Sequence, residues 1–118
     1  MEESPLNSLG QTRPLKEAEK ALLRRLLGQL EGGDEWTGHL DALEVQEMSD
    51  GGMGSLYFVG LGNDPRNRQF GRRIAELQFN DADGIPIVAS LNVDAEGALY
   101  ELDIWRTDFN RVIRLNPP

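Results

Sequence analysis

The carboxylates that stand beside turn residues are the first groups in this sequence that could do chemistry. Asp81 and Asp83 lie in a tight turn that ends in Gly84, and Asp103 comes later in the chain. Two carboxylates at a defined separation can act as acid and base in hydrolysis when burial raises one pKa. Oxygen ligands on a tight glycine turn can also bind a hard cation. A carboxylate-based or divalent-metal-dependent hydrolase is therefore one interpretation.

The pattern around this turn is incomplete for either activity. Phe79 stands where the first Asp of an EF-hand loop should be, and no Glu closes such a loop. Asp and Gly are also ordinary residues of hairpin turns. Because carboxylates at turn tips are solvated, we expect ordinary pKa values there. We predict turns rather than a metal or catalytic site.

Nucleophilic catalysis finds little support in the sequence. There is no Cys, which excludes disulfides, thiolate metal sites and Cys nucleophiles. His39 is the only histidine, lies beside no nucleophile motif, and is expected to be a surface or capping residue. The glycine-rich run 51–55 precedes a predicted strand and has no Lys, whereas phosphate-binding loops follow a strand and open a helix. We predict no catalytic residue, no metal ligand and no cofactor.

The most distinctive stretch is Tyr100–Phe109 (YELDIWRTDF). Its alternation places Trp105 and the acidic residues before it on the face opposite Leu102 and Ile104. A Trp beside carboxylates could anchor a protein partner. The favoured alternative is a structural corner, in which Trp105 and Phe109 close the end of the core. In that corner a carboxylate pairs with an arginine: Asp103 or Asp108 with Arg106 or Arg111.

Hydrophobic periodicity predicts the elements that position these residues. Leucines recur at helical spacing between Leu15 and Leu30, and Gly32 and Gly33 follow. A short helical turn is expected near Asp34–Leu40. Period-two alternation predicts strands over 43–48, 55–59, 72–80, 85–93 and 98–104, with a short last strand over 112–115.

These elements predict an α+β fold, in which the N-terminal amphipathic helix packs on an antiparallel meander sheet of about five strands. We expect residues 1–13 to be a flexible leader and residues 14–118 to be a single domain. One helix covers only part of such a sheet. The uncovered surface is available to a partner or to a second copy of the chain, as a homodimer.

A strand order that follows the chain would collect polar residues at the two ends of the sheet. One end is rich in carboxylates and forms the candidate interaction surface, made of Asp50, Asp81, Asp83, Asp103, Trp105, Arg106 and Asp108. The other end has mixed charge, with Arg66, Arg68, Arg72 and Arg73 facing Asp94 and Glu96.

Charge limits the classes of partner. The 118 residues contain 12 Lys and Arg against 20 Asp and Glu, a formal net charge of -8. Such a field repels polyanions, so we expect no nucleic acid and favour a basic protein partner. No apolar run is long enough to span a membrane and the first residues do not resemble a secretory signal, so we expect a cytoplasmic protein without a membrane partner.

Three blocks carry a family resemblance: Arg13–Leu15 (RPL), Asp50–Leu56 (DGGMGSL) and Leu91–Phe109 with its LYELDIWRTDF ending. Together they resemble a family of small bacterial domains of unknown function. The family tends to have a Thr near Lys16, a good helix N-cap, and Lys16 departs from that pattern. The resemblance implies a bacterial cytoplasmic protein and carries no activity, substrate or catalytic residue.

The sequence therefore favours a non-catalytic acidic protein-interaction domain, with the hydrolase as the alternative. Small acidic α+β proteins are common among bacterial antitoxins and immunity proteins, which suggests a second alternative by analogy of class: an inhibitor of a basic toxin.

Overall fold

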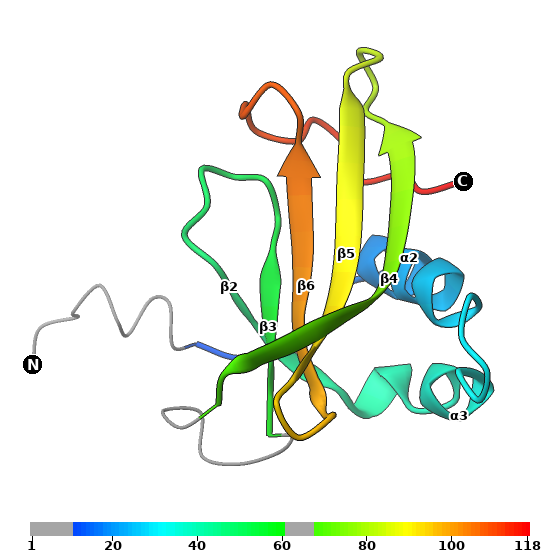
Figure 1. The fold of residues 1–118 in the computed structure, drawn as a ribbon. Coiled ribbons are helices and arrows are strands. Elements are labelled where there is room, and N and C mark those ends of the chain that lie inside the picture. The colour runs from blue at the N-terminus through cyan, green and yellow to red at the C-terminus, as the bar shows by residue number, and fades with distance from the viewer. Residues whose placement is uncertain (1–10, 61–67) are drawn as a thin grey trace, which may run out of the picture.

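The computed structural model describes residues 11–60 and 68–118, and it forms one antiparallel sheet with helices packed on one face (Figure 1). Six strands are hydrogen-bonded in the order β1-β2-β3-β6-β5-β4. None of the described helices is long and apolar enough to cross a bilayer. In chain order the elements are β1 (Arg13–Pro14), α2 (Glu17–Leu27), α3 (Asp34–Thr37), the 3-10 helix η1 (Leu40–Ala42), β2 (Glu44–Glu47), β3 (Leu56–Val59), β4 (Phe70–Asn80), β5 (Pro86–Asp94) and β6 (Leu99–Arg106).

The predicted α+β class and antiparallel sheet are confirmed, but the simple meander of about five strands is wrong. The neighbour of β3 is β6, with Leu56 opposite Leu102, so the order of the sheet breaks between β3 and β4. A sixth strand, β1, forms where Arg13 pairs with Val45. The long connection after β3 permits this order, because only short joints force consecutive strands to pair.

The two predicted ends of the sheet nevertheless persist. Every neighbouring pair of strands is antiparallel, and in the observed strand order the directions still alternate along the chain. The turns after β2 and β4 and the segment after β6 therefore lie at the same end (Figure 1). We call this the acidic end.

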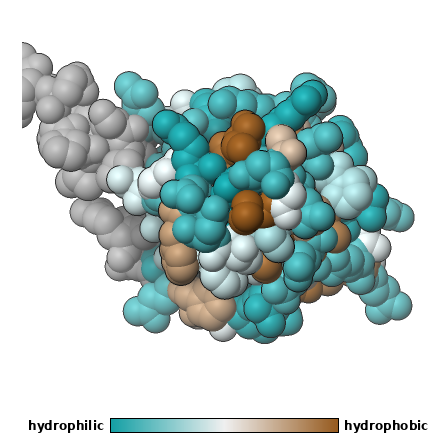
Figure 2. Space-filling view, turned by 90° about the horizontal axis from the view of Figure 1, so that it is seen from above, coloured by the Kyte–Doolittle hydropathy of each residue, from teal (hydrophilic) through white to brown (hydrophobic). Residues whose placement is uncertain are grey.

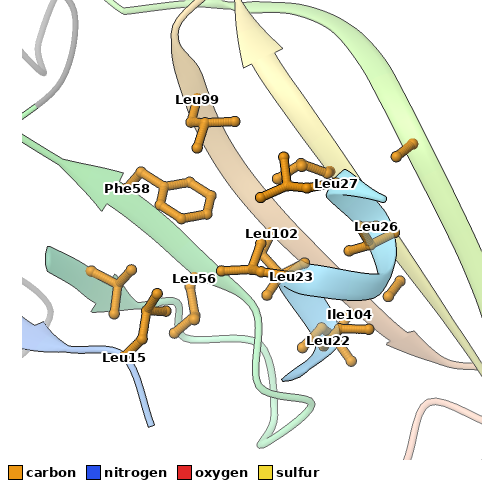
Figure 3. Close-up of a cluster of buried hydrophobic side chains, with 14 of the residues drawn as sticks. Leu15, Leu22, Leu23, Leu26, Leu27, Leu56, Phe58, Leu99, Leu102 and Ile104 are labelled. Atoms are coloured by element: carbon orange, nitrogen blue, oxygen red, sulfur yellow. The ribbon is translucent and has the colours of Figure 1, made fainter. Parts of the chain in front are cut away.

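The helix α2 supplies the core of the packed face. Its leucines Leu22, Leu23, Leu26 and Leu27 are fully buried and point at the sheet, where Figure 3 shows them beside Leu102 and its neighbours on β3 and β6. Each buried leucine stabilises the fold by roughly 1.5–3 kcal/mol. The helix ends at Leu27 with Gly28 as its C-cap, so it is shorter than predicted, and Lys16 as N-cap makes no side-chain cap hydrogen bond. Glu19 instead accepts a hydrogen bond from the Lys16 backbone at 2.8 Å.

The strand β4 is bent near its start. Its register with β5 shifts between Phe70 and Arg72 and again between Arg73 and Ala75. At Gly71 the backbone approaches β5 so closely that a Cβ would lie 2.2 Å from the Asp94 carbonyl oxygen. Figure 1 shows the first half of β4 turning out of line with the rest of the sheet.

Candidate functional site

Arg106 is the centre of the acidic end. Its guanidinium donates five hydrogen bonds to three carboxylates: to Asp81 (2.7 Å), to both oxygens of Asp83 (2.9 and 2.6 Å) and to both oxygens of Asp108 (2.8 and 3.0 Å). Five is the full donor capacity of a guanidinium. The predicted pairing of Asp108 with Arg106 is confirmed. Figure 2 views this end and shows mostly hydrophilic residues around a small hydrophobic patch.

Asp81 is buried, contrary to the prediction of a solvated turn carboxylate. Its side chain has no exposed surface, because the segment after β6 folds over it. Its carboxylate accepts backbone N–H groups from Ala82 (2.7 Å), Ile113 (2.7 Å) and Arg114 (3.0 Å). Burial alone would raise the pKa of Asp81, but the hydrogen bonds from these amides and from Arg106 outweigh it and lower the pKa to about 2.

This arrangement holds the chain together and leaves no carboxylic acid in the cluster that could donate a proton near neutral pH. Hydrogen bonds from Arg106 lower the pKa values of Asp83 and Asp108 as well, so all three acids are ionised and none can donate a proton near neutral pH. Residues 11–60 and 68–118 contain no group of three or more acidic or His side chains placed to hold a metal ion. The predicted last strand over 112–115 is absent, because its amides are directed to Asp81 and, for Val112, to the Gly52 carbonyl.

The other predicted residues of this end do not join the Arg106 cluster. Asp50 caps the glycine-rich loop after β2, accepting hydrogen bonds from the backbone of Met53 (3.1 Å) and Ser55 (2.9 Å). The backbone amides of this loop are thus directed to a carboxylate of the chain itself. Asp103 is exposed and accepts a hydrogen bond from the Ser55 hydroxyl at 3.3 Å. Asp103, which the hydrolase interpretation groups with Asp81 and Asp83, thus has Ser55 as its partner, whereas Asp81 and Asp83 share Arg106. His39 is exposed and is the N-cap residue of η1.

Trp105 and Phe109 do not close the core, so the predicted structural corner is wrong in that respect. Trp105 remains 39% exposed and Phe109 71% exposed. Their rings lie 5.8 Å apart at 52° to each other. On β6 the residues Leu102 and Ile104 are buried while Asp103 and Trp105 are exposed, which confirms the predicted alternation. The pair therefore lies at the rim of the sheet face that is opposite α2, which we call the outer face.

Carboxylates and tyrosines accompany Trp105 on the outer face. Cross-strand register places Asp103 beside Ser90, and Ser90 beside Glu76, while Glu101 is opposite Tyr57. The rings of Tyr57 and Tyr100 are 6.1 Å apart. Alternation on β6 predicted the face of Trp105 and Asp103, but nothing in the sequence indicated that Tyr57 lies opposite Glu101, since that neighbour depends on the β3–β6 pairing.

A second buried ion pair stabilises the opposite end of the sheet. Arg68 donates to Asp94 at 2.9 Å and to the carbonyl of Phe58 at 2.9 Å, with both ionic side chains almost fully buried. Its guanidinium also lies 5.0 Å above the Tyr100 ring. The predicted meeting of Arg68 with Asp94 is confirmed, whereas Arg66 lies outside the described residues.

Comparison with known proteins identifies the family alone. The sequence profile of the family described as "Domain of unknown function (DUF6984)" matches residues 12–116, so the chain belongs to that family. No curated protein and no solved structure matches the chain significantly.

Proposed function

We propose that this member of the DUF6984 family is a non-catalytic protein-interaction domain that binds a basic segment of a partner through the outer face, around Trp105 and Phe109. The observation that carries the proposal is the exposed aromatic pair at the rim of a sheet face opposite α2. Aromatic anchors of this kind dominate the binding energy of protein interfaces.

Charge on the outer face favours a basic partner. Glu101 and Asp103 lie on β6 before Trp105, and Glu76 lies on β4, on the far side of β5. Within the described ranges Asp103 has no arginine or lysine partner. Arg73, which lies on this face opposite Asn92, already pairs with Glu76 at 3.6 Å. The net charge of -8 adds long-range attraction for a cationic partner.

The rigid support beneath the site is a further argument for binding. Arg106 fixes the loop that carries Phe109 through its two hydrogen bonds to Asp108. A binding loop that is already ordered loses little conformational entropy when the partner docks. The acidic end, which the sequence offered as a binding surface, serves this supporting role because its carboxylates are already engaged.

The hydrolase alternative has weaker support. Catalysis by paired carboxylates requires one acid whose pKa is raised, whereas the pKa values of Asp81, Asp83 and Asp108 are all lowered. Inhibition of a basic toxin, in contrast, is one form of the proposed interaction, since it would use the same aromatic and acidic groups.

Selection from a phage-displayed library of random peptides tests the proposal without knowledge of the partner. We expect enrichment of peptides that combine Lys or Arg with an apolar residue, and affinity that falls steeply as salt rises from 50 to 500 mM, because screening weakens exposed charge pairs. The same peptides should bind Trp105→Ala and Phe109→Gly weakly. Failure to enrich any sequence, or equal binding to wild type and both variants, would overturn the proposal.

A further inference from the structure

Phe109 has an unusual backbone for an exposed aromatic residue. Its φ is 64°, and it is the one non-glycine residue with positive φ in ranges 11–60 and 68–118. The left-handed conformation costs an L-residue roughly 1–2 kcal/mol. Burial of the ring does not offset this cost, since 71% of Phe109 is exposed. Strained residues that the core does not require are characteristic of binding sites.

Hydrogen bonds on both sides hold Phe109 in this conformation. Its own N–H donates to the Arg106 carbonyl at 2.8 Å, and the next amide, of Asn110, donates to Asp108 at 3.0 Å. Arg106 in turn holds Asp108 through two hydrogen bonds. The clamp at the acidic end therefore determines where the Phe109 ring lies, which is against Trp105.

The two rings meet at an angle rather than stacking, and we call this tilted pair the wedge. Their planes are inclined at 52° with centroids 5.8 Å apart, and Asp103 lies two residues before Trp105 on the same face of β6. Aromatic faces attract cations within about 6 Å of the ring centroid, and an adjacent carboxylate adds charge. The cation–π contact found among the described residues is that of Arg68 with Tyr100, so no described cation of this chain fills the wedge.

We propose that the wedge of Trp105 and Phe109, together with Asp103, binds the cationic side chain of an Arg or Lys in the partner. This inference rests on the proposed function and names the group that the outer face recognises. The rings would contact the face of the guanidinium or the methylenes next to the ammonium, and the Asp103 carboxylate would accept its N–H groups. The strained Phe109 would then serve recognition, because it supplies the second ring.

The test is an NMR titration of the wild-type chain with a capped peptide, Gly-Arg-Gly-Arg-Gly, and with the same peptide carrying neutral citrulline in place of arginine. The chain has two tryptophans. Trp36 lies in α3 and packs against the core cluster, so its indole N–H serves as an internal reference for folding. We expect the Trp105 indole signal to shift saturably with the arginine peptide, and the Trp36 signal to stay in place.

The variants decide which groups bind the cation. Phe109→Gly should lower the affinity for the arginine peptide about two- to fivefold, the usual range for the loss of an exposed cation–π contact. Asp103→Asn keeps the shape of the side chain and should lower the affinity for the arginine peptide by a similar factor. An unmoved Trp36 signal shows that each variant is folded.

Two results would overturn the inference: an equal Trp105 shift with the citrulline peptide, or no Trp105 shift at millimolar arginine peptide. If either occurs while phage-selected peptides still bind wild type and not Phe109→Gly, the interaction function stands and cation recognition by the wedge is wrong.

Discussion

Arg106 and Asp81 form an ion pair with an Nη1–Oδ2 distance of 2.7 Å, in which the Asp81 side chain is completely buried. The same carboxylate accepts the backbone amides of Ile113 and Arg114. This pair therefore ties the end of β6, the turn after β4 and the C-terminal segment together. We assign the pair a role in ordering these three segments rather than in net stability, because a buried ion pair contributes little net stability on its own. Removing one partner is a different case, since it leaves the other charge buried and unpaired.

Removal of Arg106 should be strongly destabilising. Arg106→Met leaves the buried Asp81 without its cation and releases Asp83 and Asp108, so we expect a loss of about 3–5 kcal/mol in the free energy of unfolding. Urea denaturation measures it. Arg114→Met is the matched control, since Arg114 is exposed and its contact with Asp81 is made by the backbone. The control should change stability by less than about 0.5 kcal/mol. Equal effects of the two substitutions would contradict the role given to Arg106.

The same cluster predicts a loss of stability in acid. The pKa of Asp81 is about 2 in the folded chain, against about 3.9 for an unfolded Asp. A lowered folded-state pKa stabilises the fold fully above the unfolded value and loses that effect as pH falls through the folded value. Stability from Asp81 should therefore hold down to about pH 4 to 5 and decline between about pH 4 and 2.

Thermal unfolding at several pH values between 7 and 2 measures this decline, and Asp81→Asn is the matched comparison. The variant should be less stable than wild type at pH 7, and the difference should shrink toward pH 2, where wild type loses its charge. A difference that stays constant over this range would show that the ionised form of Asp81 has no special role.

Local features of this fold were predictable from the sequence, and non-local ones were not. The alternation of β6 correctly separated Leu102 and Ile104 from Asp103 and Trp105, since it depends only on the two-residue period of a strand. The β3–β6 pairing depends on residues about 45 positions apart, such as Leu56 and Leu102, and no local pattern encodes that register.

In the Arg106 cluster and its loop, too, local features were predictable and non-local ones were not. Asp81 was assigned to the correct turn, but its burial depends on amides more than 30 residues away, at Ile113 and Arg114. The Arg106–Asp108 pair was predictable because the two residues are close in sequence. The conformation of Phe109 was not, since left-handed positions are typical of Gly and Asn rather than of an aromatic residue.

Phe109 should matter little for stability. Phe109→Gly relieves roughly 1–2 kcal/mol of backbone strain but loses an aromatic contact of about 0.5–1.5 kcal/mol and gains chain entropy in the unfolded state. These effects nearly cancel, so we expect a net change within about 1 kcal/mol. Phe58→Ala is the comparison, because Phe58 is buried in the core and its truncation should destabilise by about 3–5 kcal/mol. A similarly large loss for Phe109→Gly would assign Phe109 a structural role.

Gly71 should tolerate no side chain. A Cβ there would meet the Asp94 carbonyl oxygen at 2.2 Å and carbon at 2.5 Å, so Gly71→Ala should separate β4 from β5 at the bulge and cost about 1–3 kcal/mol or more. Gly38→Ala is the control: its φ is -76° and the nearest atom to an added Cβ is 3.9 Å away. We expect the control to be neutral or slightly stabilising in thermal unfolding. Equal melting temperatures for the two variants would contradict this view of the bulge.

Gln29 occupies the free edge of the sheet. Its side-chain amide donates to the Glu76 carbonyl at 2.8 Å and accepts the Glu76 N–H at 3.4 Å, so it takes the place of a neighbouring strand on β4. β4 is an edge strand of 11 residues, and exposed edges promote pairing between chains. The Gln29 side chain thus opposes pairing of this edge with a second copy of the chain.

Gln29→Ala should therefore increase self-association. The substitution frees the Glu76 backbone groups for pairing with β4 of a second copy, and we expect a larger mass in light scattering as protein concentration rises. Arg24→Ala is the control, since Arg24 is an exposed residue of α2, the helix that ends just before Gln29. Glu76→Gln in the Gln29→Ala background should strengthen the association, because antiparallel pairing centred on Glu76 would place two carboxylates opposite each other. If Gln29→Ala remains as monomeric as Arg24→Ala at every concentration, the Gln29 amide does not protect the edge.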